Sequence, residues 1–187
     1  MLQEKTNELR IIGGTHRGRR LHFPDAPGLR PTSDRIRETL FNWLTPVIQG
    51  ARCLDLFAGS GALSFEALSR GAAEVIMIEP SPVVVNQLRS NLSLLMIECS
   101  QVIQTEALSY LDTASDAFDI IFLDPPFDMT ILPDCIEKIH SHQLCAPKAH
   151  IYIEAPKSMA LPQIPDDWQW YRNKSAGQVG YHLIHCF

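Results

Sequence analysis

Four consecutive residues, Asp124, Pro125, Pro126 and Phe127, combine a carboxylate, backbone acceptors and an aromatic ring at one point of the chain. They follow the apolar run 118–123, which is typical of a strand buried on both faces of a sheet. Because prolines lack an N–H and stiffen the chain, they fix an extended turn whose carbonyls can accept hydrogen bonds. The pattern predicts either a rigid group of acceptors or, more simply, a strand ending in a solvated aspartate.

A second chemical motif is the glycine-bearing turn that follows the predicted strand 51–57. Asp55 stands at the end of that strand, and Gly59 and Gly61 lie in the turn into a helix. Glycines there let the backbone approach a ligand and leave helix N-terminal amides free to bind it, although a tight loop would look the same. Ser64 is a poor match to the third small residue of a dinucleotide-binding fingerprint.

Glu79 ends the next predicted strand, where a carboxylate can bind both hydroxyls of a ribose or simply precede a helix cap. Asp55, Glu106 and Asp124 also follow predicted parallel strands, so the four acids should meet at one edge of the sheet. Four acids suit a ligand with an amine, a ribose and a positive centre. S-adenosylmethionine has all three, whereas a dinucleotide would bring two phosphates into a negative field.

The elements that must position these acids alternate strand and helix from residue 51 onward. This alternation predicts an α/β fold with a doubly wound, seven-stranded, mostly parallel sheet and an antiparallel pair of strands at its C-terminal edge. Residues 31–187 should form this domain, and residues 1–30 an N-terminal arm. The expected strands are 51–57, 74–80, one within 101–111, 118–124, 149–155 and a pair within 167–187. The expected helices are 32–47, 59–71, 81–95, a short one that follows the strand within 101–111, and 130–142.

The N-terminal segment carries an unusual charge. Residues 10–37 hold seven arginines against two aspartates, a balance of +5, so the rest of this chain of net charge −5 carries −10. Short apolar runs around a glycine-bearing turn in residues 9–23 predict a basic β-hairpin that projects from the body. It could contact phosphates or be an ordinary solvated hairpin.

The remaining composition excludes several classes of protein. The chain has 187 residues, and neither a signal peptide nor a membrane span is apparent in the sequence, so we expect one main domain in the cytoplasm. Five cysteines without a CxxC spacing indicate reduced core residues. The stretch CIEKIHSHQLC holds two cysteines and two histidines, but its spacing matches no closed zinc site, so we expect no metal.

Several of these stretches together resemble a known family. DLFAGSG, the strand-end Glu79 and DPPF resemble class I S-adenosylmethionine-dependent methyltransferases with a Rossmann-like fold. RIIGGTHRGRRL, LRPTSDRIRETLFNWL and GQVGYHLI more closely resemble the RsmD family, the bacterial 16S ribosomal RNA guanine-N2 methyltransferases. The resemblance runs from about residue 10 to the C-terminus.

The resemblance implies roles for individual residues. The Asp124 carboxylate and the Pro125 carbonyl would accept the two N–H bonds of the guanine amine, and Phe127, after Pro126, would stack on the extruded base. Thr32 and Arg37 would hold the methionine carboxylate of the cofactor. The predicted cofactor contacts are therefore Thr32, Arg37, Asp55, Phe57, Gly59, Gly61, Glu79, Pro80, Glu106, which stands where such enzymes often carry Asp, and Asp124.

The expected partner is 16S rRNA within the small ribosomal subunit, bound by a monomeric protein. The arginines expected to contact RNA phosphates are Arg17, Arg19, Arg20, Arg30 and Arg35. Alternatives are a DNA or RNA adenine-N6 methyltransferase, although the DNA enzyme would lack room for a target-recognition insertion, and a non-catalytic nucleic-acid-binding module with this fold. A protein glutamine methyltransferase would more often carry Asn in place of Asp124.

Overall fold

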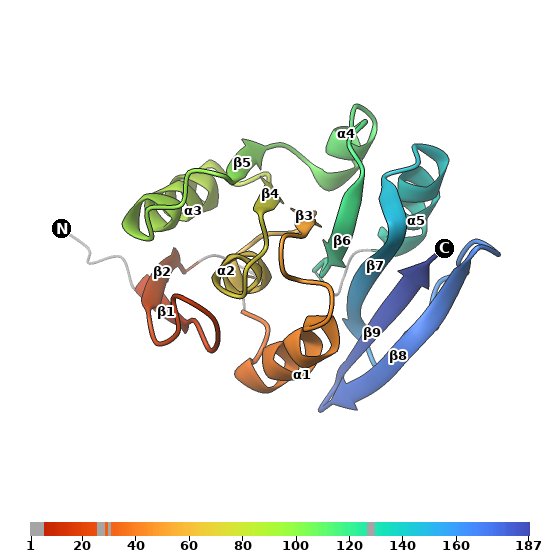
Figure 1. Ribbon diagram of the computed structural model, residues 1–187, viewed down its shortest axis with the longest axis horizontal. Coiled ribbons are helices and arrows are strands. Elements are labelled where there is room, and N and C mark those ends of the chain that lie inside the picture. Colours follow the sequence, from red (N-terminus) through yellow and green to blue (C-terminus); the bar gives the residue numbers. More distant parts are fainter. Residues whose placement is uncertain (1–5, 26–28, 30, 127–129) are drawn as a thin grey trace.

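The computed structural model describes residues 6–25, 29, 31–126 and 130–187. Its centre is a seven-stranded sheet with the strand order β5-β4-β3-β6-β7-β9-β8 (Figure 1). The first five strands in this order are parallel, and β9 and β8 are antiparallel to their neighbours. The doubly wound sheet predicted from the sequence is thus confirmed. The strands are β3 (Arg52–Asp55), β4 (Glu74–Glu79), β5 (Gln101–Gln104), β6 (Phe118–Leu123), β7 (Cys145–Pro156), β8 (Trp168–Ala176) and β9 (Val179–Cys186).

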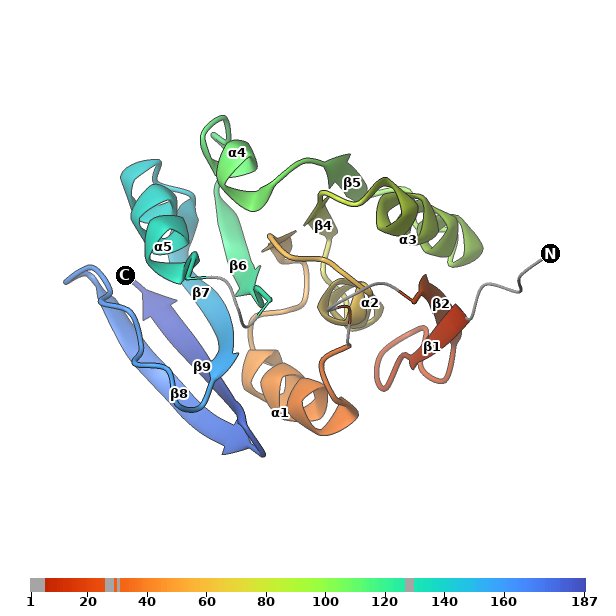
Figure 2. The same ribbon diagram turned by 180° about the vertical axis from the view of Figure 1, so that it is seen from behind.

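Helices cover both faces of the sheet, as Figure 2 shows from behind. Three helices pack into one buried apolar cluster on the first face, and the other two pack into a second cluster on the opposite face. The first helix buries one apolar stripe, Ile36, Leu40 and Leu44, and Ser33 caps the helix by accepting from Ile36 N. The helices are α1 (Asp34–Leu44), α2 (Ala62–Ser69) and α3 (Pro82–Leu94) on the first face, and α4 (Ala107–Leu111) and α5 (Leu132–Ser141) on the second.

The N-terminal hairpin pairs β1 (Thr6–Arg10) with β2 (Arg20–Pro24) in antiparallel register, as predicted. It does not project from the body, however. Its apolar residues Leu9, Ile11, Leu21 and Phe23 are buried in the cluster shared with α1–α3, because leaving four large apolar side chains in water would cost several kcal/mol. Figure 1 shows the hairpin lying beside α2 and α3.

The hairpin turn is held on the last residue of α2 by hydrogen bonds. Ser69 O accepts from Thr15 N at 2.7 Å, and Ser69 Oγ accepts from His16 N at 2.9 Å. Gly14 lies at φ +75°, and a Cβ there would meet Ser69 O at 1.7 Å. Only glycine therefore fits this close backbone contact.

The carboxyl ends of the parallel strands β3, β4 and β6 lie together at the point where the strand order of the sheet changes direction. β3 pairs with β4 on one side and with β6 on the other. Asp55 is opposite both Met77 and Phe122, so Glu79 and Asp124 each lie two residues beyond a partner of Asp55. A switch point of this kind is where open α/β sheets bind their ligands.

Candidate active site

Asp55 stabilises the glycine-bearing turn after β3. This carboxyl is buried, and its oxygens accept hydrogen bonds from Ser64 Oγ at 2.6 Å and from Phe57 N at 3.3 Å. Burial raises the pKa of Asp55 to about 6, against the effect of these donors. Ser64, a poor match to a dinucleotide fingerprint, therefore connects α2 to the end of β3.

The backbone of the turn needs its glycines. Gly59 and Gly61 have φ values of +49° and +80°, and a Cβ on Gly61 would meet the Phe65 ring at 2.3 Å. The side chain of Leu29 lies over Gly59, where its Cδ1 would be 3.0 Å from an added Cβ. The segment before α1 and the glycine turn are thus in contact.

Glu79 joins the end of β4 to the same turn. Its carboxylate accepts from Gly59 N at 3.1 Å and from Ser81 N at 2.9 Å. Burial raises the pKa of Glu79, and the charge of Glu106 contributes in the same direction. Ser81 takes the N-cap position of α3, but its side chain makes no capping hydrogen bond. Pro80 and Glu106 are exposed at this edge.

Asp124 stands at the tip of β6, partly accessible to solvent. Its Oδ2 accepts from Thr32 Oγ1 at 3.2 Å, so the segment before α1 reaches the strand tip. Burial, followed by the charge of Glu154, raises the pKa of Asp124 well above its ordinary value. Pro125 is buried and Pro126 is exposed, whereas the predicted base-stacking Phe127 lies outside the described residues.

Two further polar residues join this site from β7. Glu154 is 4% exposed and accepts a hydrogen bond from Tyr152 Oη at 2.8 Å. Burial raises the pKa of Glu154 to about 7, against the lowering effect of the Tyr152 and Thr32 hydroxyls. Neither Tyr152 nor Glu154 was predicted from the sequence, although Glu154 ends a predicted parallel strand as Glu79 does, and that signal could have found it.

Arg37 lies in a different environment from the one expected of a cofactor ligand. Its guanidinium is 1% exposed and contacts Glu66 at 3.4 Å, Asp34 at 2.6 Å and the carbonyl of Arg10 at 2.9 Å. These bonds connect α1, α2 and the hairpin. The structure brings Thr32 to Asp124 but engages Arg37 with protein partners instead.

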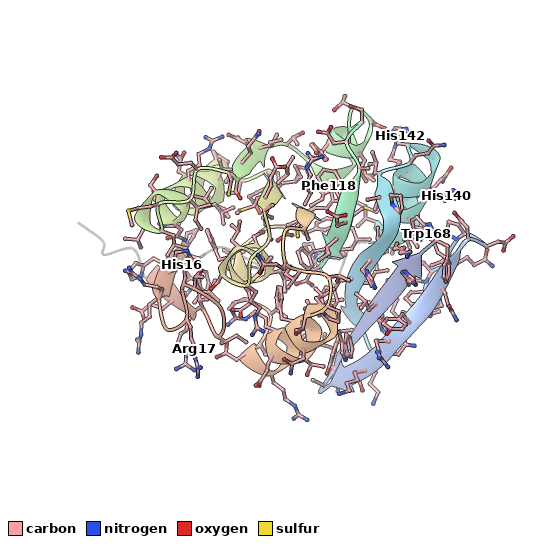
Figure 3. All side chains as sticks on the ribbon, in the orientation of Figure 1. His16, Arg17, Phe118, His140, His142 and Trp168 are labelled. Carbon is pink, nitrogen blue, oxygen red and sulfur yellow. The ribbon has the colours of Figure 1, made fainter. Side chains whose placement is uncertain are left out.

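The predicted RNA-contacting arginines are spread over the hairpin and the start of α1. Arg17, Arg19, Arg20 and Arg35 are exposed, and Arg20 pairs with Glu8 at 2.8 Å. Arg30 lies outside the described residues. In Figure 3, His16 and Arg17 lie at the hairpin, across the molecule from His140 and His142.

The surface beside the proline turn is hollowed. Pro125, Pro126, Glu154, Pro156 and Met159 line a narrow crevice that is too small to hold a water molecule. It adjoins a wider hollow of about 360 Å³, and the two share Pro156 and Met159. The wider hollow is also lined by Lys157, Leu161, Asn173, Lys174, Ser175, Gly180 and His182.

Within residues 6–25, 29, 31–126 and 130–187, no group of three or more potential metal ligands gathers at one point. In the same part of the chain, none of the helices has both the length and the apolar character needed to cross a membrane. The candidate site is built from carboxylates, hydroxyls and backbone groups. Together they can accept hydrogen bonds from an amine or from ribose hydroxyls.

Comparison with known proteins identifies the family of this chain. The family model described as Conserved hypothetical protein 95 matches residues 9–185. The chain is 48% identical to "Ribosomal RNA small subunit methyltransferase D" of Escherichia coli strain K12, over 95% of this chain and 90% of that protein. It is 43% identical to the protein of the same name from Haemophilus influenzae, over 94% and 93%.

Solved structures agree in fold. The Escherichia coli protein yhhF superposes with a TM-score of 0.90 at 44% identity, over 96% of this chain and 98% of that one. SMU.776, solved in complex with SAH, shares the fold with a TM-score of 0.76 at 13% identity, over 99% of this chain and 57% of that one. The sequence resemblance to the RsmD family is confirmed: the chain belongs to this family of ribosomal RNA small subunit methyltransferases.

Proposed function

We propose that this protein transfers a methyl group from S-adenosylmethionine to the exocyclic N2 of a guanine in 16S rRNA. The observation that carries the proposal is the position of Asp124. It is a partly accessible carboxyl at the tip of a buried strand, two residues past a partner of Asp55 in the sheet. The names and identities of the family relatives support the same reaction.

The donor set at the glycine turn fits S-adenosylmethionine. Glu79 uses its two oxygens on Gly59 N and Ser81 N, and each carboxylate oxygen has a further lone pair for a ribose hydroxyl. The surrounding carboxyls favour a ligand with a positive centre over one with phosphates. When bound, the cofactor supplies an electrophilic methyl group on a sulfonium, so the reaction needs no metal.

The contribution of the protein is to orient the amine. The nitrogen of the guanine amine is a poor nucleophile because its lone pair is delocalised into the ring. The Asp124 carboxylate and the Pro125 carbonyl would each accept one N–H bond and so direct the lone pair at the methyl group. Phe127 would stack on the base. The rate gain then comes from positioning and electrostatics.

The exposed Arg17, Arg19, Arg20 and Arg35, together with Arg30, would hold the phosphates of the RNA. Guanidinium groups suit phosphate because their planar donors bind two oxygens at once. We also propose that the protein acts as a monomer, in the cytoplasm, on rRNA already within the small subunit. A greater initial rate on assembled subunits than on naked 16S rRNA would support this choice of substrate.

The deciding experiment is methyl transfer from labelled S-adenosylmethionine to small subunits from a strain that lacks the modification. We expect one labelled nucleoside, N2-methylguanosine. Asp124→Ala protein, checked for cofactor binding by calorimetry, is the matched control and should give almost no label. Recovery of N6-methyladenosine would instead favour the adenine methyltransferase, and cofactor binding without transfer would favour the non-catalytic module.

A further inference from the structure

The hollow of about 360 Å³ at the carboxyl end of β7 has no part in the proposed methyl transfer. It lies close to the proline turn, because Pro156 and Met159 line both the hollow and the crevice beside Pro125 and Pro126. Its volume is near the lower end of the range of about 300–1,000 Å³ that is typical of small-ligand pockets. The hollow is therefore suited to a single nucleotide and too small for a folded segment of RNA or protein.

Backbone hydrogen bonds fix the walls of this hollow. Lys157 N donates to Gln178 O at 2.7 Å, which joins the segment after β7 to the turn between β8 and β9. Met159 N donates to Pro156 O at 2.9 Å, so the segment after β7 itself folds into a turn. The hollow is thus formed before any ligand arrives, and ordering its walls costs a ligand little binding energy.

The hollow carries positive charge. Lys157 and Lys174 line it, and the described residues around it include no aspartate or glutamate. Neither lysine forms an ion pair with a described residue. The Lys174 ammonium instead lies 6.0 Å from the centre of the Trp43 ring on α1. Two lysines without a carboxylate partner favour an anionic ligand, and phosphate is the anion that RNA supplies.

His182 adds a hydrogen-bond acceptor to the lining. Its Nδ1 lies 2.8 Å from Asn173 Oδ1, and because that oxygen can only accept, Nδ1 carries the ring proton. Nε2 is then the acceptor, and Gly180 leaves room for it, since a Cβ on Gly180 would meet Nε2 at 2.9 Å. Burial lowers the pKa of His182, so the ring is neutral at pH 7. Such a nitrogen can accept from an N–H of a base or from a ribose 2′-hydroxyl.

The hollow and the basic hairpin lie on opposite sides of Asp124. In the sheet, β7, β9 and β8 follow β6 on one side, whereas β3, β4 and β5 lie on the other. The hairpin packs on the second side, where Asn91 of α3 donates to His22 O at 2.9 Å (Figure 1). An RNA strand that contacts the hairpin arginines and passes the tip of β6 therefore reaches the hollow next.

We propose that this hollow binds the nucleotide next to the target guanine, with its phosphate on Lys157 and Lys174 and a hydrogen bond donated to His182. The inference rests on the proposed function of Asp124. A base that leaves its stack deprives its neighbours of a stacking partner, so a site for one neighbour stabilises the extruded state. The same site makes the reaction depend on the nucleotide beside the guanine as well as on the guanine.

Crosslinking identifies the nucleotide that occupies the hollow. Leu161, which lines the hollow and is 38% exposed, is replaced by photoreactive benzoylphenylalanine, and the protein is irradiated on small subunits that lack the modification. We expect a crosslink, mapped by primer extension, to the nucleotide on one side of the guanine that the wild-type enzyme methylates. The same replacement of Glu137, exposed on α5, is the control and should give no such crosslink. A crosslink to the guanine itself, to a distant nucleotide or to a ribosomal protein, or no crosslink, would overturn the inference.

The salt dependence of subunit binding tests the two lysines. Lys157→Gln combined with Lys174→Gln should reduce the slope of log affinity against log salt concentration by about 1.4, because each phosphate contact to a single strand contributes about 0.7. Lys148→Gln, which removes an exposed cation near the other end of β7, is the matched control and should keep the wild-type slope. Filter binding measures these slopes, and calorimetry should give the same affinity for S-adenosylmethionine in all variants.

Failure of this inference and failure of the proposed function give different results. An unchanged salt slope in the double lysine variant would overturn the role of the hollow even where the enzyme methylates guanine. Absence of methyl transfer by the wild-type protein would instead count against the proposed function.

Discussion

Two buried carboxyls, Glu66 and Glu154, are stabilised in opposite ways. Glu66 is 0% exposed and lies between two guanidinium groups, those of Arg37 at 3.4 Å and Arg70 at 2.6 Å, and it also accepts from Ile12 N at 2.9 Å. The negative charge of Glu66 is thus balanced by the positive charges of the two guanidinium groups. These bonds join the hairpin, α1 and α2, so this cluster serves the fold.

Glu154 and its neighbour Asp124 have hydroxyl partners instead. Tyr152 and Thr32 supply neutral donors, and each carboxyl raises the energy of the other when both are ionised. Such an arrangement stabilises the fold less, but it keeps a carboxyl available for a ligand. The difference indicates that a buried acid with arginine partners is a structural element, whereas one with only hydroxyl partners is a candidate for chemistry.

Removing the charge of Glu66 should give the largest loss of stability. Glu66→Gln leaves the buried Arg37 without its buried counter-ion, and breaking a buried pair typically costs about 3–5 kcal/mol of unfolding free energy. Urea unfolding measures the loss. Glu38→Gln, an exposed acid on α1, should change the free energy by less than about 0.5 kcal/mol. Equal effects of the two substitutions would contradict the structural role of the Glu66 cluster.

Asp124→Ala tests a carboxyl whose hydrogen-bond partner is a hydroxyl group and not a guanidinium. We expect turnover to fall by about 10²–10³-fold, the scale of a lost group that stabilises the transition state, with cofactor affinity within a few-fold of wild type. Asp124→Asn should retain more activity than Ala because its amide oxygen still accepts one hydrogen bond. Single-turnover rates measure both. Near wild-type turnover in Asp124→Ala would return this turn to the simple reading of a strand end.

Glu79 differs from both kinds of carboxyl, because its partners are the backbone amides of Gly59 and Ser81 and neither arginines nor hydroxyls. Glu79→Ala should weaken binding of S-adenosylmethionine by about 1–3 kcal/mol through lost hydrogen bonds to a charged group. Calorimetry measures this affinity. Glu98→Ala, an exposed acid in the loop after α3, is the control and should leave the affinity unchanged. If the Glu79 variant also binds as wild type does, the ribose contact must lie elsewhere.

The last prediction concerns the dependence of stability on pH. The pKa of Glu154 is raised from 4.5 to about 7 in the folded protein, so the unfolded chain releases this proton first. Unfolding free energy should therefore fall as pH rises between these values, by at most about 1.4 kcal/mol per pH unit, and level off above them. Denaturant titrations of wild type and Glu154→Gln in parallel isolate this contribution. An unchanged slope in the variant would assign the pH dependence to other groups, of which Asp55 is one.

The sequence predicted the parts of the molecule that follow from local pattern. Strand and helix alternation gave the doubly wound sheet, and topology then placed Asp55, Glu79 and Asp124 at one edge, because carboxyl ends of parallel strands share it. The family resemblance was also visible in short motifs.

What the sequence could not predict depends on partners distant in the chain. Nothing near Arg37 indicates that Glu66, twenty-nine residues away, would meet its guanidinium and bury it. The docking of the hairpin likewise depends on Ser69, fifty-four residues from Thr15. Glu154 stands at a predicted strand end, but its burial beside Tyr152 appears only once β7 lies next to β6.

The eight residues of α2 set a fixed spacing within the molecule. Its first turn begins at Gly61 in the glycine turn, and its last residue, Ser69, holds the hairpin. An α-helix of this length measures about 12 Å and hardly stretches. Inserting one residue into it would shift Ser69 by about 1.5 Å and rotate it by about 100°, away from Gly13 and His16. The hairpin and the glycine turn therefore keep a constant separation, because the rigid helix α2 connects them.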